Sequence, residues 1–337
     1  MGGAYGRFRS RACCGALNVR DSFIRTLISL ADKDPRIVLM TGDLGFGVLE
    51  EFEARFPQRY FNAGVAEQNL AAVASGLAME GHVVFTYSIG NFPTLRCLEQ
   101  LRNDALYHEA PVKVVCIGGG FSYGPLGMSH HATEDLSIMR ALPNLTISAP
   151  ATAFETTQIV EEIARRPGAS YLRIERGSPD FVDSGAVPFT FGKARQLREG
   201  RDFCVIAAGG ITVEAVRAAE QLSALGIQCR VLSMHTLKPF DADTVLRAAA
   251  ETGGIVTVEE NTVIGGLGGA VAEACLEGGV PPRRFHRIGM RDQFSVVVGD
   301  QAFLRCHYGM DATAIVSAVQ RLLGTADSGE RLEARSR

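Results

Sequence analysis

The strongest constraint on the fold is a regular alternation of short β-branched segments with longer amphipathic segments. The short segments predict strands at 37–40, 82–88, 112–118, 145–150 and 170–174. Segments with helical periodicity lie beside them at 19–32, 67–80, 93–107, 134–140 and 152–165. Parallel strands need long crossover connections, which helices commonly provide. The pattern therefore predicts an α/β domain with a mainly parallel sheet and helices on both faces.

The same pattern restarts after residues 176–194, a segment rich in glycine, proline and serine that we interpret as an interdomain linker. Strands expected at 203–209, 228–234 and 254–260 alternate with helices expected at 212–225, 241–252 and 267–277. We therefore expect a second, smaller α/β domain. The expected boundaries are a disordered arm (1–16), a first domain (17–177), a linker (178–192), a second domain (193–325) and a disordered tail (326–337).

Composition narrows the class of protein. A length of 337 residues suits two domains. The net charge is −3, and acidic and basic residues are interspersed, so the sequence shows no charged surface of the kind that binds nucleic acid or membrane. No apolar run reaches membrane-spanning length, and the first residues lack the apolar core of a signal peptide. The eight cysteines form no CxxC pair. We expect reduced thiols in a cytoplasmic protein.

One carboxylate, Glu67, stands at the expected start of the helix over 67–80 in a run that carries no other charge before Glu80. A buried carboxylate must be paired, hydrogen-bonded or protonated. A structural glutamate that accepts from backbone amides at the helix start is one interpretation. A functional carboxylate is the other.

Two further motifs suggest sites. Gly265–Gly269 loosely resembles a dinucleotide loop, but it follows a late strand, so a glycine-lined helix start is favoured. His130 and His131 follow the glycine-rich loop 118–129, with two acidic residues after them. No third ligand has a recognisable spacing, so we expect no metal there. A histidine that hydrogen-bonds or transfers protons in an active-site loop is favoured.

Seven segments occur together in an order that resembles the transketolase family of thiamine-diphosphate enzymes. They are GDL (42–44), NAGVAEQNLAAVASGLA (62–78), TYSIGNFPTLRCLEQLRND (86–104), GMSHHATEDLSIMRALPNLTISAP (127–150), YLRIERG (171–177), LSMHTLKPFD (232–241) and VEENTVIGGLGGAVAE (258–273). The resemblance covers nearly everything from residue 17 to 325. It implies that the first domain is the pyrimidine-binding domain and the second is the transketolase C-terminal domain.

The resemblance implies a cofactor site. In this family the glutamate at the position of Glu67 hydrogen-bonds N1′ of the aminopyrimidine of thiamine diphosphate, and sharing that proton promotes the imino form that deprotonates C2. Phe92 matches the aromatic ring that stacks on the pyrimidine, although a plain core phenylalanine is the alternative. Ile89 and Leu95 replace neighbours that are often aromatic. Asp43 and Leu44 match the loop that the family places beside the cofactor.

The resemblance also implies substrate contacts. His130 matches the histidine that contacts the substrate carbonyl. Arg20 and Arg176 resemble two arginines that bind the distal phosphate, with surface salt bridges as the alternative. Leu126 falls where transketolases place an acid that hydrogen-bonds a substrate hydroxyl. Phosphate-binding serine and histidine correspond to Gly47 and Gly118, so we expect altered specificity, such as a 2-oxo acid donor or an unusual acceptor.

No GDG…N motif, which binds the diphosphate and Mg²⁺ in full-length members, occurs in the chain. The resemblance therefore implies the smaller subunit of a split enzyme, an α₂β₂ assembly whose partner holds Mg²⁺. Three alternatives stay open. They are the E1β subunit of a 2-oxo acid dehydrogenase, a relative of deoxyxylulose-phosphate synthase, and a non-catalytic structural or regulatory paralogue.

Overall fold

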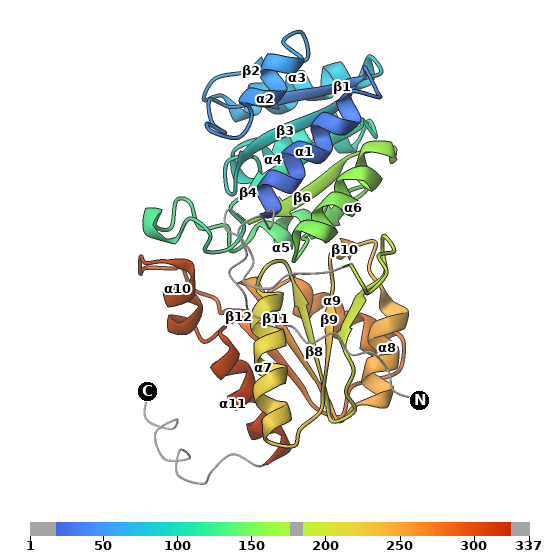
Figure 1. The fold of residues 1–337 in the computed structure, drawn as a ribbon, viewed down its shortest axis with the longest axis vertical. Coiled ribbons are helices and arrows are strands. Elements are labelled where there is room, and N and C mark those ends of the chain that lie inside the picture. The colour runs from blue at the N-terminus through green and yellow to red at the C-terminus, as the bar shows by residue number, and fades with distance from the viewer. Residues whose placement is uncertain (1–17, 176–184, 325–337) are drawn as a thin grey trace.

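The computed structural model describes residues 18–175 and 185–324, which form two α/β domains joined end to end (Figure 1). The expected arm, the expected tail and residues 178–184 of the expected linker lie outside these residues. All strands and most helices predicted from the sequence are present, with ends within two residues of expectation. The α/β class with two mainly parallel sheets is confirmed.

The first sheet has seven strands in the order β10-β5-β6-β4-β3-β1-β2. Its parallel strands are β1 (Ile37–Thr41), β2 (Tyr60–Asn62), β3 (Val83–Ile89), β4 (Val112–Ile117), β5 (Thr146–Ser148) and β6 (Ser170–Ile174). The central strands β1, β3 and β4 are buried almost throughout. Burial on both faces explains why these strands are mostly apolar and show no regular alternation of apolar and polar residues.

Helices cover both faces of this sheet. The helices α1 (Val19–Ala31) and α6 (Ala153–Arg165) pack together on one face, where they share a core with alternate residues of the strands. The helices α3 (Glu67–Met79) and α5 (Asp135–Arg140) pack with the opposite set of strand residues. A short helix, α2 (Glu50–Arg55), lies between β1 and β2 in the chain.

The second sheet has five strands in the order β12-β11-β8-β9-β7. These strands are β7 (Arg195–Arg198), β8 (Phe203–Ala208), β9 (Cys229–Ser233), β11 (Ile255–Thr262) and β12 (Phe285–Met290). The helices are α7 (Thr212–Ala224), α8 (Ala242–Glu251), α9 (Leu267–Glu277), α10 (Gln301–His307) and α11 (Ala312–Leu323). The helices α7 and α11 pack against each other, and α8 packs against α9 (Figure 1).

One predicted helix is wrong in type. Residues 93–107 form no continuous α-helix but a 3₁₀ turn, η1 (Leu95–Cys97), a short α-turn, α4 (Leu98–Gln100), and a π-helical segment, η2 (Leu101–Leu106). Pro93 does not explain this difference, because proline is tolerated in the first turn of a helix. π-Helical turns are frequent at functional sites.

Several elements were not predicted from the sequence: β2, β7, β10, β12, α2, α10 and α11. All except α11 have seven residues or fewer, and α11 has 12 residues. The most consequential is β10 (Thr236–Lys238), which lies in the range expected for the second domain but pairs antiparallel with β5 in the first sheet. A buried ion pair also joins the two halves, since Arg195 of β7 lies 3.0 Å from Glu155 of α6. Among the described residues, no helix has the length and apolar character needed to cross a membrane.

Candidate functional site

The candidate residues gather at the carboxyl ends of the parallel strands in the first sheet. From β1 the chain passes to β2 on one side and then to β3 on the other side. Ligands of open α/β sheets bind at such a reversal of strand order. The segments that follow β1, β2, β3 and β4 carry Asp43, Glu67, Phe92 and His130, in that order.

Glu67 is the first residue of α3 and is 5 % exposed, as the sequence predicted. Its partner is a side chain and not the backbone amides of the helix start: Arg96 Nη1 lies 3.0 Å from Glu67 Oε1. The same guanidinium lies over the ring of Phe92, 3.9 Å from the ring centroid. A flat cation therefore contacts both the buried carboxylate and the aromatic ring.

Sequence reasoning missed Arg96. The available signal was its position four residues after Phe92, a spacing at which side chains meet on an α-helix. The backbone between them is a turn and a 3₁₀ segment, because α4 begins only at Leu98. The contact with Glu67, 29 residues earlier in the chain, depends on the tertiary structure.

His130 reaches the same cluster from the loop after β4. Its ring meets the ring of Phe92 edge-on, with centroids 5.3 Å apart. Burial, and then the nearby charges of His131 and Arg96, lower the pKa of His130, so its ring is largely neutral at pH 7. The Ser129 hydroxyl lies 3.0 Å from Nδ1, so Nε2 is the ring nitrogen for which the structure gives no side-chain hydrogen bond among the described residues.

His131 has a different role. Its side chain is buried, and Nε2 lies 2.9 Å from the Gly124 carbonyl oxygen within the same loop. Its ring packs edge-on against Phe121. Of the two histidines, only His130 contacts the Phe92 cluster. Among the residues that the structure describes, no three His, Cys, Asp or Glu side chains are placed to bind a metal.

Asp43 and Leu44 lie in the loop after β1. Asp43 has a φ of 57°, and its amide donates to Asn62 Oδ1 at 2.8 Å. The same Asn62 oxygen accepts from the Gly64 amide at 3.0 Å, so the loop is tied to the segment that leads into Glu67. The Leu44 carbonyl accepts from the Thr41 hydroxyl at 2.9 Å.

The other predicted residues make different contacts; the Ile89 carbonyl, for example, accepts from the Phe92 amide at 2.8 Å. Ile89 ends β3 and is half-buried, while Leu95 and Leu126 are exposed. Arg20 lies in the first turn of α1, 3.8 Å from Asp21, and no described hydrogen bond joins it to Glu67, Phe92 or His130. The predicted Arg176 lies outside the described residues.

The glycine-rich segment 265–269 forms a helix start, as favoured from the sequence, because α9 begins at Leu267. The buried carboxylate of Glu259 accepts from the amides of Leu267 and Gly268 at 2.7 and 2.8 Å. A Cβ at Gly266 would lie 2.0 Å from Glu259 Oε2, so this position requires glycine. The side chain of Glu259 occupies the place that a ligand phosphate would take in a dinucleotide loop.

Comparison with known proteins gives two matching family models. Residues 15–180 match "Transketolase, pyrimidine binding domain", and residues 192–315 match "Transketolase, C-terminal domain". The chain is 38 % identical to one of the subunits of the apulose-4-phosphate transketolase of Phocaeicola vulgatus, covering 88 % of this chain and 94 % of the relative. It is also 38 % identical to a 6-deoxy-6-sulfo-D-fructose transketolase subunit of a Clostridium species, covering 90 % and 94 %.

One solved structure extends the comparison to the fold. It is described as a split-gene transketolase in an inactive β₄ tetramer, and it superimposes with a TM-score of 0.82 at 37 % identity. The match covers 93 % of this chain and all of that chain. Both domains are therefore shared with that protein.

Proposed function

The chain belongs to the transketolase family, and we propose that it is the β-type subunit of a thiamine-diphosphate-dependent transketolase-like enzyme. The observation that carries the proposal is the cluster of Glu67, Phe92 and His130 at the switch point of the first sheet. Relatives matched over nearly their whole length are transketolase subunits, which favours this function over the 2-oxo acid dehydrogenase alternative.

The residues present fit the aminopyrimidine ring of the cofactor. The Arg96 guanidinium is a flat hydrogen-bond donor, and it contacts both the Glu67 carboxylate and the Phe92 face. A flat heteroaromatic ring that donates from N1′ would make the same two contacts. We therefore assign Glu67 and Phe92 to the pyrimidine, with Ile89 and Leu95 as aliphatic neighbours and Asp43 and Leu44 beside it.

The bound cofactor supplies a carbon nucleophile that accepts a two-carbon unit from a ketose or 2-oxo acid and releases it to an aldehyde. Glu67 holds a proton at N1′, for which its buried position is suited. His130, kept neutral by the causes given above, donates a hydrogen bond from a ring N–H to the substrate carbonyl oxygen. Phe92 orients the ring by stacking.

The substrate is proposed to differ from ordinary sugar phosphates. Leu126 offers no polar atom beyond its backbone where an acid is expected, and the Tyr123 ring fills the space above Gly118, since a Cβ there would lie 2.2 Å from that ring. Each polar partner lost from a buried site costs about 1–3 kcal/mol of binding. A less hydroxylated donor or an unusual acceptor fits, with Arg20 and Arg176 proposed for its anionic end.

The partner is proposed to be an N-terminal-type subunit that carries the GDG…N motif, Mg²⁺ and the diphosphate, in an α₂β₂ tetramer. Exposed apolar side chains lie just before α3, at Val65, and on α3 itself, at Val73, and they support an interface between subunits near Glu67. We also propose a cytoplasmic location, which the free thiols of the described cysteines support.

The proposal is tested by affinity purification of the full chain from its native host, with mass spectrometry of the proteins that co-purify. We expect a stoichiometric partner containing GDG…N. Isothermal titration of the purified pair with thiamine diphosphate and Mg²⁺ should then give one site per β chain. A donor screen on that pair identifies the substrate.

A homodimer that binds no thiamine diphosphate, even when mixed with a GDG…N partner, would contradict the proposal. That outcome favours the non-catalytic paralogue. A pair that turns over only with a lipoyl carrier would favour the 2-oxo acid dehydrogenase subunit instead.

A further inference from the structure

The loop that carries His130 is closed at its base by two backbone hydrogen bonds. The Gly120 amide donates to the Ala132 carbonyl at 2.9 Å, and the Ala132 amide donates to the Gly120 carbonyl at 3.0 Å. Gly120 has a φ of 59°, which glycine adopts without strain. Because His130 is only two residues before Ala132, a shift of this base moves His130 with it.

Arg173 of β6 contacts this base directly. It is 5 % exposed, and its Nη2 donates to the carbonyls of Ala132 and Glu260 at 3.0 and 2.7 Å. Its Nε lies 3.3 Å from the buried Asp135 carboxylate as an ion pair. A Cβ at Gly119 would lie 2.1 Å from that Nε, so the loop packs on the guanidinium without a gap.

The acceptors of Arg173 come from both domains, because Glu260 belongs to β11 of the second sheet. The Glu260 carboxylate is itself held by Arg305 of α10 through two contacts of 3.0 Å each. The Thr262 amide, also in β11, donates to the Thr133 carbonyl at 2.6 Å. The second domain therefore fixes the C-terminal side of the loop base.

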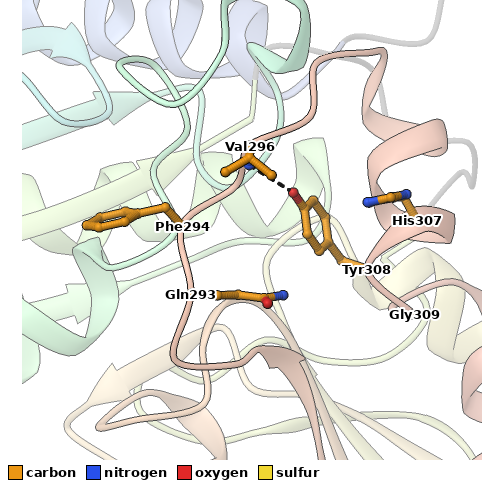
Figure 2. A pocket seen from close by; sticks show the side chains of 6 residues that line it. All are labelled: Gln293, Phe294, Val296, His307, Tyr308 and Gly309. Carbon is orange, nitrogen blue, oxygen red and sulfur yellow. Dashed lines mark hydrogen bonds between the residues drawn. The ribbon is translucent and has the colours of Figure 1, made fainter. Parts of the chain in front are cut away.

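The second domain also covers the other side of the loop. Tyr308 stacks on Phe121 with ring centroids 5.4 Å apart, and its hydroxyl accepts from the Val296 amide at 3.1 Å (Figure 2). An ideal Cβ at Gly124 would lie 2.2 Å from the Gly299 carbonyl oxygen. The loop is thus enclosed between Arg173 and the second-domain segment that contains Val296 and Gly299.

We propose that Arg173 is a positioning residue for His130, and that the second domain acts on the candidate site through it. The inference rests on the proposed role of His130. A guanidinium presents several donors in a rigid plane, so it satisfies two carbonyls and a carboxylate at once. A lysine ammonium keeps the charge beside Asp135 but is a point donor on a flexible stem.

Hydrogen–deuterium exchange on the full chain tests the positioning step without any catalytic readout. The variants are Arg173→Lys and the double variant Arg173→Met/Asp135→Asn, which leaves no buried carboxylate alone. We expect exchange of peptides spanning 120–132 to accelerate about tenfold or more, since the loop base loses its side-chain support. Peptides from α6 should keep their wild-type rate.

A matched control is Arg195→Lys, because Arg195 is an equally buried arginine paired with Glu155 outside the loop. This control should leave exchange of 120–132 unchanged. Wild-type exchange of that loop in Arg173→Lys, which keeps the charge and needs no second substitution, would overturn the proposal even if the double variant fails to fold.

The assembled enzyme supplies a second readout. In Arg173→Lys we expect kcat to fall about tenfold to a hundredfold, while the dissociation constant of thiamine diphosphate stays within about threefold. A loss of cofactor affinity as large as the loss of kcat contradicts a positioning role. If exchange accelerates but Glu67→Gln remains fully active, the positioning stands and the proposed function fails.

Discussion

The two sides of the candidate site are built differently. The Glu67 side depends on contacts among residues 67–96, which all belong to the first sheet and its connections. The His130 side depends on Arg173 and on Glu260, Thr262 and Tyr308 of the second domain. We infer that changes in the second domain alter substrate handling more than cofactor binding.

The largest expected effect on turnover comes from replacing the Glu67 carboxylate. Glu67→Gln keeps the shape but loses the proton that Glu67 is proposed to hold, so kcat should fall about 10²–10⁴-fold. The assay is steady-state turnover of the assembled enzyme, with subunit assembly checked by light scattering. Glu80→Gln, at the exposed end of α3, is the control and should retain activity. Turnover by Glu67→Gln at the wild-type rate would contradict the proposal that Glu67 holds a proton at N1′.

Replacing His130 should have a smaller effect, on kcat/KM and not on cofactor affinity. His130→Asn keeps a polar side chain but cannot serve as a neutral imidazole, so kcat/KM should fall about tenfold to a hundredfold. Affinity for thiamine diphosphate, measured by calorimetry, should stay within a few-fold of wild type. If cofactor affinity falls in parallel with kcat/KM, the two sides are not separable.

In the second domain, Glu259 should make the free energy of unfolding depend on pH. Burial raises the pKa of Glu259 to about 7 from 4.5. Because the pKa in the folded state is above the unfolded value of 4.5, protonated Glu259 stabilises the fold. This contribution is complete below pH 4.5 and is lost as the pH rises through about 7. Between pH 4 and pH 8, wild type should lose on the order of 2–3 kcal/mol of unfolding free energy relative to Glu259→Gln.

Urea unfolding of the full chain at several pH values measures this difference. Glu277→Gln is the matched control, because Glu277 is an exposed carboxylate at the far end of α9, the helix whose first amides donate to Glu259, and its curve should run parallel to wild type. Parallel curves for wild type and Glu259→Gln would show that the buried carboxylate does not titrate in this range.

The smallest expected effect concerns Arg96. Its side chain is about half exposed, and such ion pairs contribute roughly 0.2–1 kcal/mol. Its guanidinium contacts both Glu67 and Phe92, where we propose that the pyrimidine binds. On that proposal the cofactor displaces Arg96, and Arg96→Gln should bind thiamine diphosphate about two- to fivefold more tightly. Titration calorimetry on the assembled enzyme measures this change, with Arg102→Gln as control. Weaker binding in Arg96→Gln would mean that Arg96 supports the cofactor.

The sequence by itself determined the α/β class, the inner strands of both sheets and the start of α3 at Glu67. These features are local, since β-branched runs and helical periodicity are set by residues near one another in the chain. The ordered motifs also located His130 and Phe92, because each follows a strand that the pattern predicted.

Only the tertiary structure decided which side chains meet. Arg96 reaches Glu67, β10 joins the first sheet, and Arg173 connects the His130 loop to Glu260, 87 residues later. Each contact joins segments distant in the chain, and short polar elements such as β10 carry too little periodicity to be recognised. Tertiary packing, within the first domain for Arg96 and between the two domains for β10 and Arg173, selected these contacts.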